Sequence, residues 1–292
     1  MTARRPGWST LALTVLAMIA FAANSLLCRA ALASGAIDAA TFTVVRVVSG
    51  AVLLCLLLLW PPRRRLSFSA PMALMLFVYM LGFSLAYDSL TAATGALLLF
   101  GAVQLTMLSW ALRSGEVFGP IRWAGMALAF GGLVYLLMPG VSAPDPRGAA
   151  LMITAGLAWG IYSLLGRGSR DPLADTAGNF LLAVPLGIIA WWIVPSLGGT
   201  PVFMTTSGVL LALASGALAS GVGYVLWYAA LPGLGAGRAA TVQLSVPVLA
   251  GLGGVILLSE PLSSRLLLAC AIVLGGIALA LRKPAGQVGD GS

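Results

Sequence analysis

Aromatic residues at helical spacing are the feature of this sequence best suited to bind another molecule. They recur every three or four residues within apolar stretches, as Tyr79, Phe83 and Tyr87, as Tyr224, Trp227 and Tyr228, and as the pair Trp159 and Tyr162. Positions three or four apart share one face of an α-helix, so each set predicts a stripe of rings along a helix. Rings gathered around a cavity would bind a flat apolar solute by stacking.

Each aromatic residue taken alone also has a simpler interpretation. Rings at helical spacing commonly pack against neighbouring helices, and Tyr87 and Tyr228 lie near predicted helix ends, where an interfacial aromatic belt is expected. The pairing of two stripes in corresponding parts of the chain is what favours a binding wall. If those parts are structural equivalents, we expect the stripes to face each other across a central axis.

Uncharged polar residues within apolar stretches form the second group of candidates. These residues could form hydrogen bonds with a substrate's ammonium or carboxylate group, or they could join helices to one another. For Asn179 we favour the joining role. The other members of this group are Asn24, Gln104, Gln243 and Ser245.

Arg46 is the one strong cation predicted to lie inside a membrane span. It could attract a carboxylate group of a substrate. We favour a structural alternative, in which Arg46 pairs with a helix C-terminal carbonyl or with Asp38 or Asp88. Asp88 is also the acid nearest the aromatic residues in sequence, and it is a second candidate for charge recognition.

The residue types of this sequence disfavour an enzyme. Histidine is absent, and the eight carboxylates show no catalytic pairing. These facts exclude Ser-His and Cys-His catalysis and histidine-based metal sites. Cys28, Cys55 and Cys270 lie far apart within apolar stretches, without the spacing of a metal site. We therefore expect no cofactor and no bound metal.

The elements that must position these residues are membrane helices. The chain has 292 residues, of which 60% are hydrophobic and 8% charged, and its mean hydropathy is +1.03. An ordinary soluble domain carries about a quarter charged residues. Since one membrane crossing takes roughly 20 apolar residues, the sequence predicts an all-α protein with ten spans. We place them at 8–33, 39–60, 69–87, 91–113, 120–138, 148–167, 174–195, 205–229, 236–258 and 264–281.

The net charge of +8 indicates membrane orientation and not nucleic-acid binding, because the cations lie in short turns between apolar stretches. A cytoplasmic N-terminus leaves only Arg29, Arg147 and Arg265 on the outside. It places on the inside Arg4, Arg5, Arg63, Arg64, Arg65, Arg113, Arg122, Arg167, Arg170, Arg238, Arg282 and Lys283. This bias predicts that both termini are cytoplasmic.

The two halves of the chain resemble each other. Ser25-Leu26-Leu27-Cys28-Arg29 matches Ser163-Leu164-Leu165-Gly166-Arg167 at an offset of 138 residues. Tyr87 and Leu90 match Tyr228 and Leu231 at 141, and Glu116 with Gly131-Gly132 matches Glu260 with Gly275-Gly276 at 144. Each copy would hold five spans, so the second copy enters the membrane from the opposite side. We predict inverted repeats over 1–140 and 147–285, and a disordered tail over 286–292.

These features resemble the drug/metabolite transporter superfamily, and within it the ten-helix EamA-type transporters. Each half begins with a small-rich helix that ends in a basic residue, an arginine lies in the second helix (Arg46), and a glutamate precedes a Gly-rich helix, as in Gly115-Glu116 and Ser259-Glu260-Pro261. The chain is most similar to YddG-type exporters of aromatic amino acids. The resemblance implies an inner-membrane location. It also implies a small-molecule substrate and the lipid bilayer as partners.

The predicted function is export of small hydrophobic or aromatic solutes by alternating access at a central aromatic-lined cavity. We expect no obligatory proton coupling, because no acid lies mid-span and histidine is absent. Pro185 and Pro247 would interrupt the seventh and ninth spans as hinges, and Glu116 and Glu260 would cap the helices that follow them. Alternatives are an exporter of cationic drugs, purines or sugar phosphates, and a non-transporting assembly or receptor subunit. Both a monomer and a homodimer fit the sequence.

Overall fold

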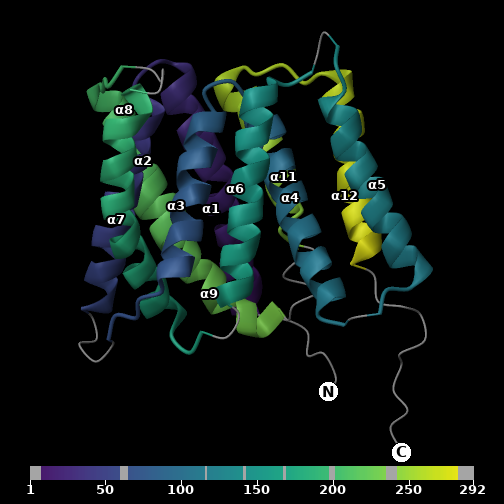
Figure 1. Cartoon of the computed structure of the whole chain (residues 1–292), viewed down its shortest axis with the longest axis horizontal. Helices are drawn as coiled ribbons and strands as arrows, with labels where there is room; N and C mark the ends of the chain where they lie inside the picture. The colour runs from purple at the N-terminus through teal and green to yellow at the C-terminus, as the bar shows by residue number, and fades with distance from the viewer. Residues whose placement is uncertain are drawn as a thin grey trace, which may run out of the picture.

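The computed structural model describes residues 8–59, 65–115, 117–140, 143–166, 169–196, 201–234 and 242–281, and these residues are almost entirely helical (Figure 1). The helices are α1 (Trp8–Ala33), α2 (Ala39–Leu58), α3 (Ala70–Ala86), α4 (Ala92–Arg113), α5 (Pro120–Leu137), α6 (Pro146–Leu165), α7 (Pro172–Ser196), α8 (Thr206–Leu213), η2 (Ala214–Val222), α9 (Gly223–Leu234), α11 (Ser245–Leu258) and α12 (Ser264–Ala280). Extended pairing in these ranges is limited to one isolated bridge between Ile37 and Met204.

The predicted all-α membrane fold is confirmed. Seven helical segments within the described ranges are long and apolar enough to cross a membrane, and α3, α11 and α12 are shorter apolar helices. The segments α8, η2 and α9 follow one another without a break and form the eighth predicted span. Helix ends differ from the predicted ends by a few residues. The predicted tail (286–292) and the residues Glu116 and Arg167 lie outside the described residues.

The helices begin where side chains can receive the free backbone N–H groups of a first turn. Asp38, Thr91 and Asp145 each accept a backbone N–H from three residues further on, at the starts of α2, α4 and α6. Ser263 does the same for α12. Proline stands in the first turn of α3, α5 and α6, where its missing N–H costs nothing.

The two predicted hinge prolines lie at different places in their helices. Pro185 lies inside α7, as expected. Pro247, however, is the third residue of α11. The first four N–H groups of a helix have no partner within it, so a proline there interrupts no hydrogen bond. The predicted ninth span is nevertheless interrupted at 243–244, just before α11 begins, and a hinge role for Pro247 stays a prediction.

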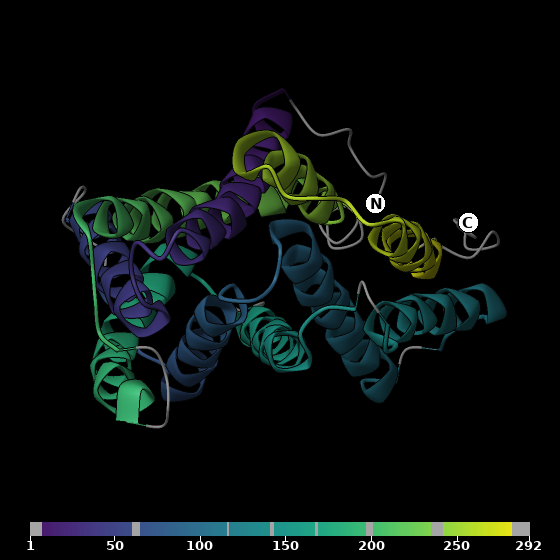
Figure 2. The same ribbon diagram turned by 90° about the horizontal axis from the view of Figure 1, so that it is seen from above.

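Helices from the two predicted repeats lie against each other in pairs. α3 packs on α6, α2 on α7, α1 on α9, and α11 on α4. Seen from above, these helices surround the middle of the molecule (Figure 2). The pairing brings segments far apart in sequence to a common centre, which is where the aromatic residues of α3, α6 and α9 meet.

α5 and α12 form a separate pair at one end of the molecule (Figures 1 and 2). Their backbones approach closely at glycines. A Cβ atom at Gly125 would lie 2.5 Å from the backbone nitrogen of Ala280, and one at Gly276 would lie 2.5 Å from that of Ala129. Small residues allow such close contact between membrane helices. The Gly-rich predicted helices thus pack on each other within one chain.

Candidate functional site

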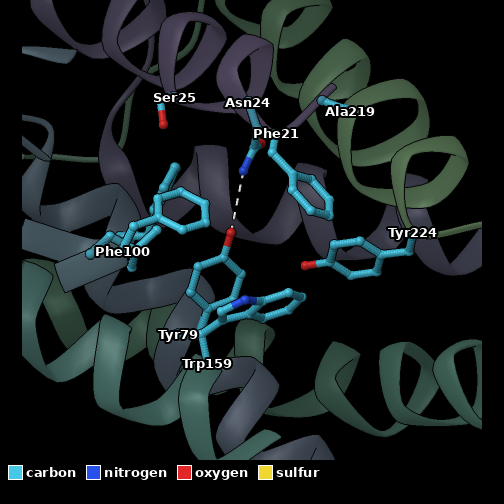
Figure 3. A pocket seen from close by; sticks show the side chains of 10 residues that line it. Phe21, Asn24, Ser25, Tyr79, Phe100, Trp159, Ala219 and Tyr224 are labelled. Atoms are coloured by element: carbon cyan, nitrogen blue, oxygen red, sulfur yellow. Dashed lines mark hydrogen bonds between the residues drawn. The ribbon is translucent and has the colours of Figure 1, made fainter. Parts of the chain in front are cut away.

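A cavity lies in the middle of the helical assembly (Figure 3). Its walls come from α1, α3, α4, α6, η2 and α9, and its lining residues are Phe21, Asn24, Ser25, Tyr79, Phe83, Leu99, Phe100, Trp159, Ala219 and Tyr224. Its volume is about 20 Å³, which accommodates about one water molecule. An amino acid does not fit until the walls move apart.

Trp159 connects the two aromatic stripes. Its ring centroid lies 4.9 Å from that of Tyr79 on α3 and 5.1 Å from that of Tyr224 on α9. It also stacks on Tyr162, one turn further along α6, at 5.4 Å and an interplanar angle of 22°. The stripes therefore meet through an indole from a third helix, as Figure 3 shows for Tyr79, Trp159 and Tyr224.

Phe21 on α1 completes the ring of aromatic side chains. Its centroid lies 6.1 Å from that of Tyr224 and 5.9 Å from that of Trp227, both in edge-on arrangements. Sequence reasoning did not select Phe21. It also missed four further lining residues: Ser25, Leu99, Phe100 and Ala219.

A polar network crosses the cavity. The side-chain amide nitrogen of Asn24 donates to the Tyr79 hydroxyl at 3.3 Å, as drawn in Figure 3. The hydroxyl of Ser215 donates to the amide oxygen of Asn24 at 2.6 Å. Asn24 is 5% exposed and Ser215 is fully buried. Asn24 thus joins α1 to both α3 and η2 at the cavity wall, and it is a polar group that a substrate entering the cavity would meet.

The π-helical segment η2 supplies two of the hydroxyl groups near the cavity. Ser215 and Ser220 both lie on it and are buried. π-helical turns occur mostly as single bulges inside α-helices and frequently at functional sites. Gly216 lies between these serines, and a Cβ atom there would collide with the backbone of Arg46. The small residues of η2 therefore allow it to lie directly on α2.

Arg46 is fully buried on α2. Its Nη2 atom donates to the Tyr79 hydroxyl at 3.0 Å, and its Nε atom donates to the Ser220 hydroxyl at 3.3 Å. The guanidinium carbon lies 4.8 Å from the Phe83 ring centroid and 5.3 Å from that of Tyr79. Its Nη1 atom has no hydrogen-bond partner among the described residues.

The favoured prediction for Arg46, pairing with an acid or a helix C-terminal carbonyl, is wrong. Asp38 accepts the backbone N–H groups of Thr41 and Phe203, and so fixes the loop before α8 to the start of α2. The side chain of Asp88 is exposed at the α3–α4 turn. Arg46 instead donates to two neutral hydroxyl groups, so the described residues leave its positive charge uncompensated.

Several predicted site residues lie outside the cavity wall. The ring of Tyr87 packs on Phe83 at 4.8 Å, and its hydroxyl donates to the carbonyl of Ala92 at 3.4 Å. Gln243 lies in the turn before α11, and Ser245 is the first residue of α11, where its hydroxyl donates to the carbonyl of Val242. Four other predicted site residues are buried or half-buried but do not line the cavity: Gln104, Tyr162, Trp227 and Tyr228.

An ion pair next to Tyr87 connects several helix ends. The Nε atom of Arg29 on α1 lies 2.8 Å from a carboxylate oxygen of Glu260. Arg29 also donates to the carbonyls of Tyr87 and Asp88, at 2.9 and 3.2 Å. The second oxygen of Glu260 accepts the N–H of Ala92 at 2.8 Å. The pair therefore links the ends of α1 and α3, the start of α4 and the turn before α12.

The prediction that Glu260 caps the helix following it is wrong. The side chain of Ser263 caps α12. Glu260 receives the first N–H of α4, from the other predicted repeat. The carboxylate still lies at a helix N-terminus, as the electrostatics of helix ends favours.

The sequence matches one protein family and several known proteins. Residues 146–282 match the EamA-like transporter family. An uncharacterized protein of Pseudomonas aeruginosa is 54% identical over 286 residues, which are 97% of this chain and 98% of that protein. The threonine/homoserine exporter RhtA of Escherichia coli K12 is 31% identical over 175 residues, 56% of this chain and 57% of that protein.

Two further proteins resemble this chain. An uncharacterized transporter of Archaeoglobus fulgidus is 32% identical over 163 residues, 54% of this chain and 56% of that protein. One crystal structure superposes with a TM-score of 0.64 over 92% of this chain and 96% of the other, at 23% identity, which shows a common fold. Together with the apolar helices, the matches show that the chain belongs to the EamA-like transporter family of the drug/metabolite transporter superfamily and is a multi-pass membrane transporter, not an enzyme.

Proposed function

We propose that the protein exports amino acids with aromatic or large apolar side chains through the central cavity. The observation that carries this proposal is the position of Trp159 between Tyr79 and Tyr224, within 5.1 Å of both ring centroids. Three aromatic rings from three helices present faces and edges on which a substrate ring can stack. Small-molecule sites are mostly apolar and carry few polar groups, which here include Asn24, Ser25 and the Tyr79 and Tyr224 hydroxyls.

The relatives support the amino-acid class of substrate. RhtA is named as an exporter of threonine and homoserine, which share the ammonium and carboxylate groups of all amino acids. The aromatic lining distinguishes a large apolar side chain from these small polar ones. The YddG-type resemblance of the sequence points in the same direction.

The alternative substrates fit the cavity less well. A cationic drug would meet no carboxylate among the ten lining residues and would lie near the buried positive charge of Arg46. A sugar phosphate carries two negative charges and is expected to require several basic residues. The ten lining residues include no basic side chain, and Arg46 packs against two of them, Tyr79 and Phe83.

Transport requires the cavity to open. At about 20 Å³ the cavity is closed around its rings, so substrate entry must separate Trp159 from Tyr79 or Tyr224. Movement of one inverted repeat (1–140) against the other (147–285), in an inner membrane, is the arrangement we propose, because α3 and α6 belong to different repeats. No histidine or carboxylate lines the cavity, so we propose facilitated movement without obligatory proton coupling.

The test is transport by purified protein in liposomes. Uptake of labelled phenylalanine, tryptophan and threonine is measured with and without an imposed pH gradient, and protein-free liposomes are the control. Saturable uptake of the two aromatic amino acids, unchanged by the gradient, supports the proposal. Uptake of threonine alone contradicts the aromatic specificity, and an absence of uptake of all three contradicts the amino-acid class.

A further inference from the structure

We infer that Arg46 is the anion site of the transport cavity and binds the carboxylate group of the substrate. This inference rests on the proposed amino-acid substrate. Its starting point is a buried guanidinium whose Nη2 and Nε atoms donate to the hydroxyls of Tyr79 and Ser220 and whose Nη1 atom has no partner in the described part of the chain. A bound carboxylate would supply that partner.

The charge of Arg46 is not balanced by any carboxylate in the described ranges. Asp38 accepts two backbone N–H groups, and Glu260 is paired with Arg29. Asp145 caps α6, and Asp175 accepts from Ser169. Removing an unpaired charge from water is strongly unfavourable. Such residues inside membrane proteins are rare, and by default they suggest a functional site.

The position of Arg46 relates it to the cavity. Tyr79 and Phe83 both line the cavity, and the guanidinium lies over both rings at 5.3 and 4.8 Å. The Tyr79 hydroxyl accepts hydrogen bonds from Arg46 and from Asn24, and Asn24 itself lines the cavity. A small rotation of the Tyr79 side chain would therefore expose the guanidinium to a ligand in the cavity.

The chemistry of the group selects the ligand. A guanidinium presents parallel N–H donors that match the two oxygens of a carboxylate, and such charge-assisted bonds are about twice as strong as neutral ones. The aromatic rings would hold the apolar part of the same molecule. One cation next to an aromatic wall fits a molecule with one carboxylate and one ring, which an aromatic amino acid is.

A purely structural role makes a different prediction. In that account Arg46 only joins α2 to α3 and η2 through the two hydroxyls, and ligands with and without a carboxylate behave alike. The two accounts are therefore separated by comparing ligands on the unaltered protein, before any residue is replaced.

The first experiment measures thermal stabilisation of the wild-type protein in detergent by 3-phenylpropionate, phenylethylamine and phenylalanine. The inference predicts stabilisation by phenylpropionate and phenylalanine at concentrations about tenfold or more below those needed for phenylethylamine, since only the first two can form a charge-assisted hydrogen bond with Arg46 through a carboxylate. Equal stabilisation by the acid and the amine would overturn it. Inorganic phosphate is included, and stabilisation by phosphate equal to that by phenylpropionate would also overturn the carboxylate assignment.

The second experiment compares Arg46→Gln with Arg265→Gln in liposomes. Arg265 lies on α12, at the end of the molecule away from the cavity, and donates to the carbonyl of Met138. We expect R46Q to lose about tenfold or more of phenylalanine uptake relative to phenylethylamine uptake, and R265Q to retain the wild-type ratio. An unchanged ratio in R46Q would contradict the inference. If R46Q does not fold, the ligand series on the wild-type protein decides alone.

The failures of the two proposals are distinguishable. Wild-type protein that transports none of the amino acids refutes the proposed function. If the wild-type protein transports phenylalanine and R46Q keeps the wild-type ratio of phenylalanine uptake to phenylethylamine uptake, only the role of Arg46 is refuted.

Discussion

Arg29 and Glu260 lie 231 residues apart in sequence and form an ion pair of 2.8 Å. Their side chains are only 17% and 10% exposed. Arg29 also donates to the carbonyl of Tyr87, and Glu260 accepts the N–H of Ala92. The pair therefore connects helix ends from both predicted repeats. It stabilises the closed arrangement of the helices next to the cavity.

The first prediction concerns this pair. Replacement of Arg29 or Glu260 by glutamine leaves the other charge largely buried without its partner, and each change should destabilise the fold by about 3 kcal/mol. Unfolding of R29Q, E260Q and the double variant is followed in detergent. The double variant should be clearly more stable than the sum of the two single effects predicts. Additive effects would show that the two side chains do not interact.

The second prediction uses two neighbouring glycines on α12. A Cβ atom at Gly276 would lie 2.5 Å from the backbone of Ala129 on α5, whereas one at Gly275 meets nothing within 4 Å. Gly276→Ala should force α5 and α12 apart and lower the unfolding temperature. Gly275→Ala should leave it unchanged or raise it slightly, since alanine favours helix by about 0.5–1 kcal/mol. Equal effects at the two positions would contradict the close packing.

The third prediction concerns the pH dependence of stability. A hydrogen bond from the Gly148 N–H, and a second from the Ser89 hydroxyl, hold the pKa of Asp145 below its usual value. A carboxyl whose pKa is lower in the folded state stabilises the fold above its unfolded pKa, about 3.9. That contribution is lost as the pH falls through the folded pKa. The unfolding temperature of wild type should therefore approach that of Asp145→Asn between pH 6 and pH 3. A constant difference would contradict this.

The fourth prediction concerns coupling. Asp88 is exposed at the α3–α4 turn and does not line the cavity. Asp88→Asn should transport substrate at the wild-type rate, both with and without a pH gradient. A gradient-dependent flux in the wild type that this replacement abolishes would refute facilitated transport and assign Asp88 to proton coupling.

The sequence predicted the helices well, because an apolar stretch between charged turns has one stable form in a membrane. It also selected five of the ten lining residues, since Asn24, Tyr79, Phe83, Trp159 and Tyr224 are aromatic or polar within apolar helices. Leu99 and Ala219 resemble every other apolar residue of their helices. No pattern in the sequence separates them from residues that face lipid.

Phe21 could have been found. It precedes Trp159 by 138 residues, the same offset that relates Ser25 to Ser163, and both residues line the cavity. The contacts of Arg46 with Ser220 and of Glu260 with Ala92 could not be found in this way, because each joins segments from different predicted repeats. Pairings of this kind depend on how the helices pack and leave no trace in local spacing.

Trp159 provides the most direct test of the central claim that the aromatic cavity is the transport site. Its ring lies between Tyr79 and Tyr224, whereas Trp192 on α7 is 70% exposed on the outer surface of the fold. Tryptophan counterflow is measured in liposomes for W159A and W192A. The account predicts that W159A loses at least about tenfold of the flux, or about 1.4 kcal/mol, and that W192A keeps the wild-type flux. Equal flux in the two variants would contradict it.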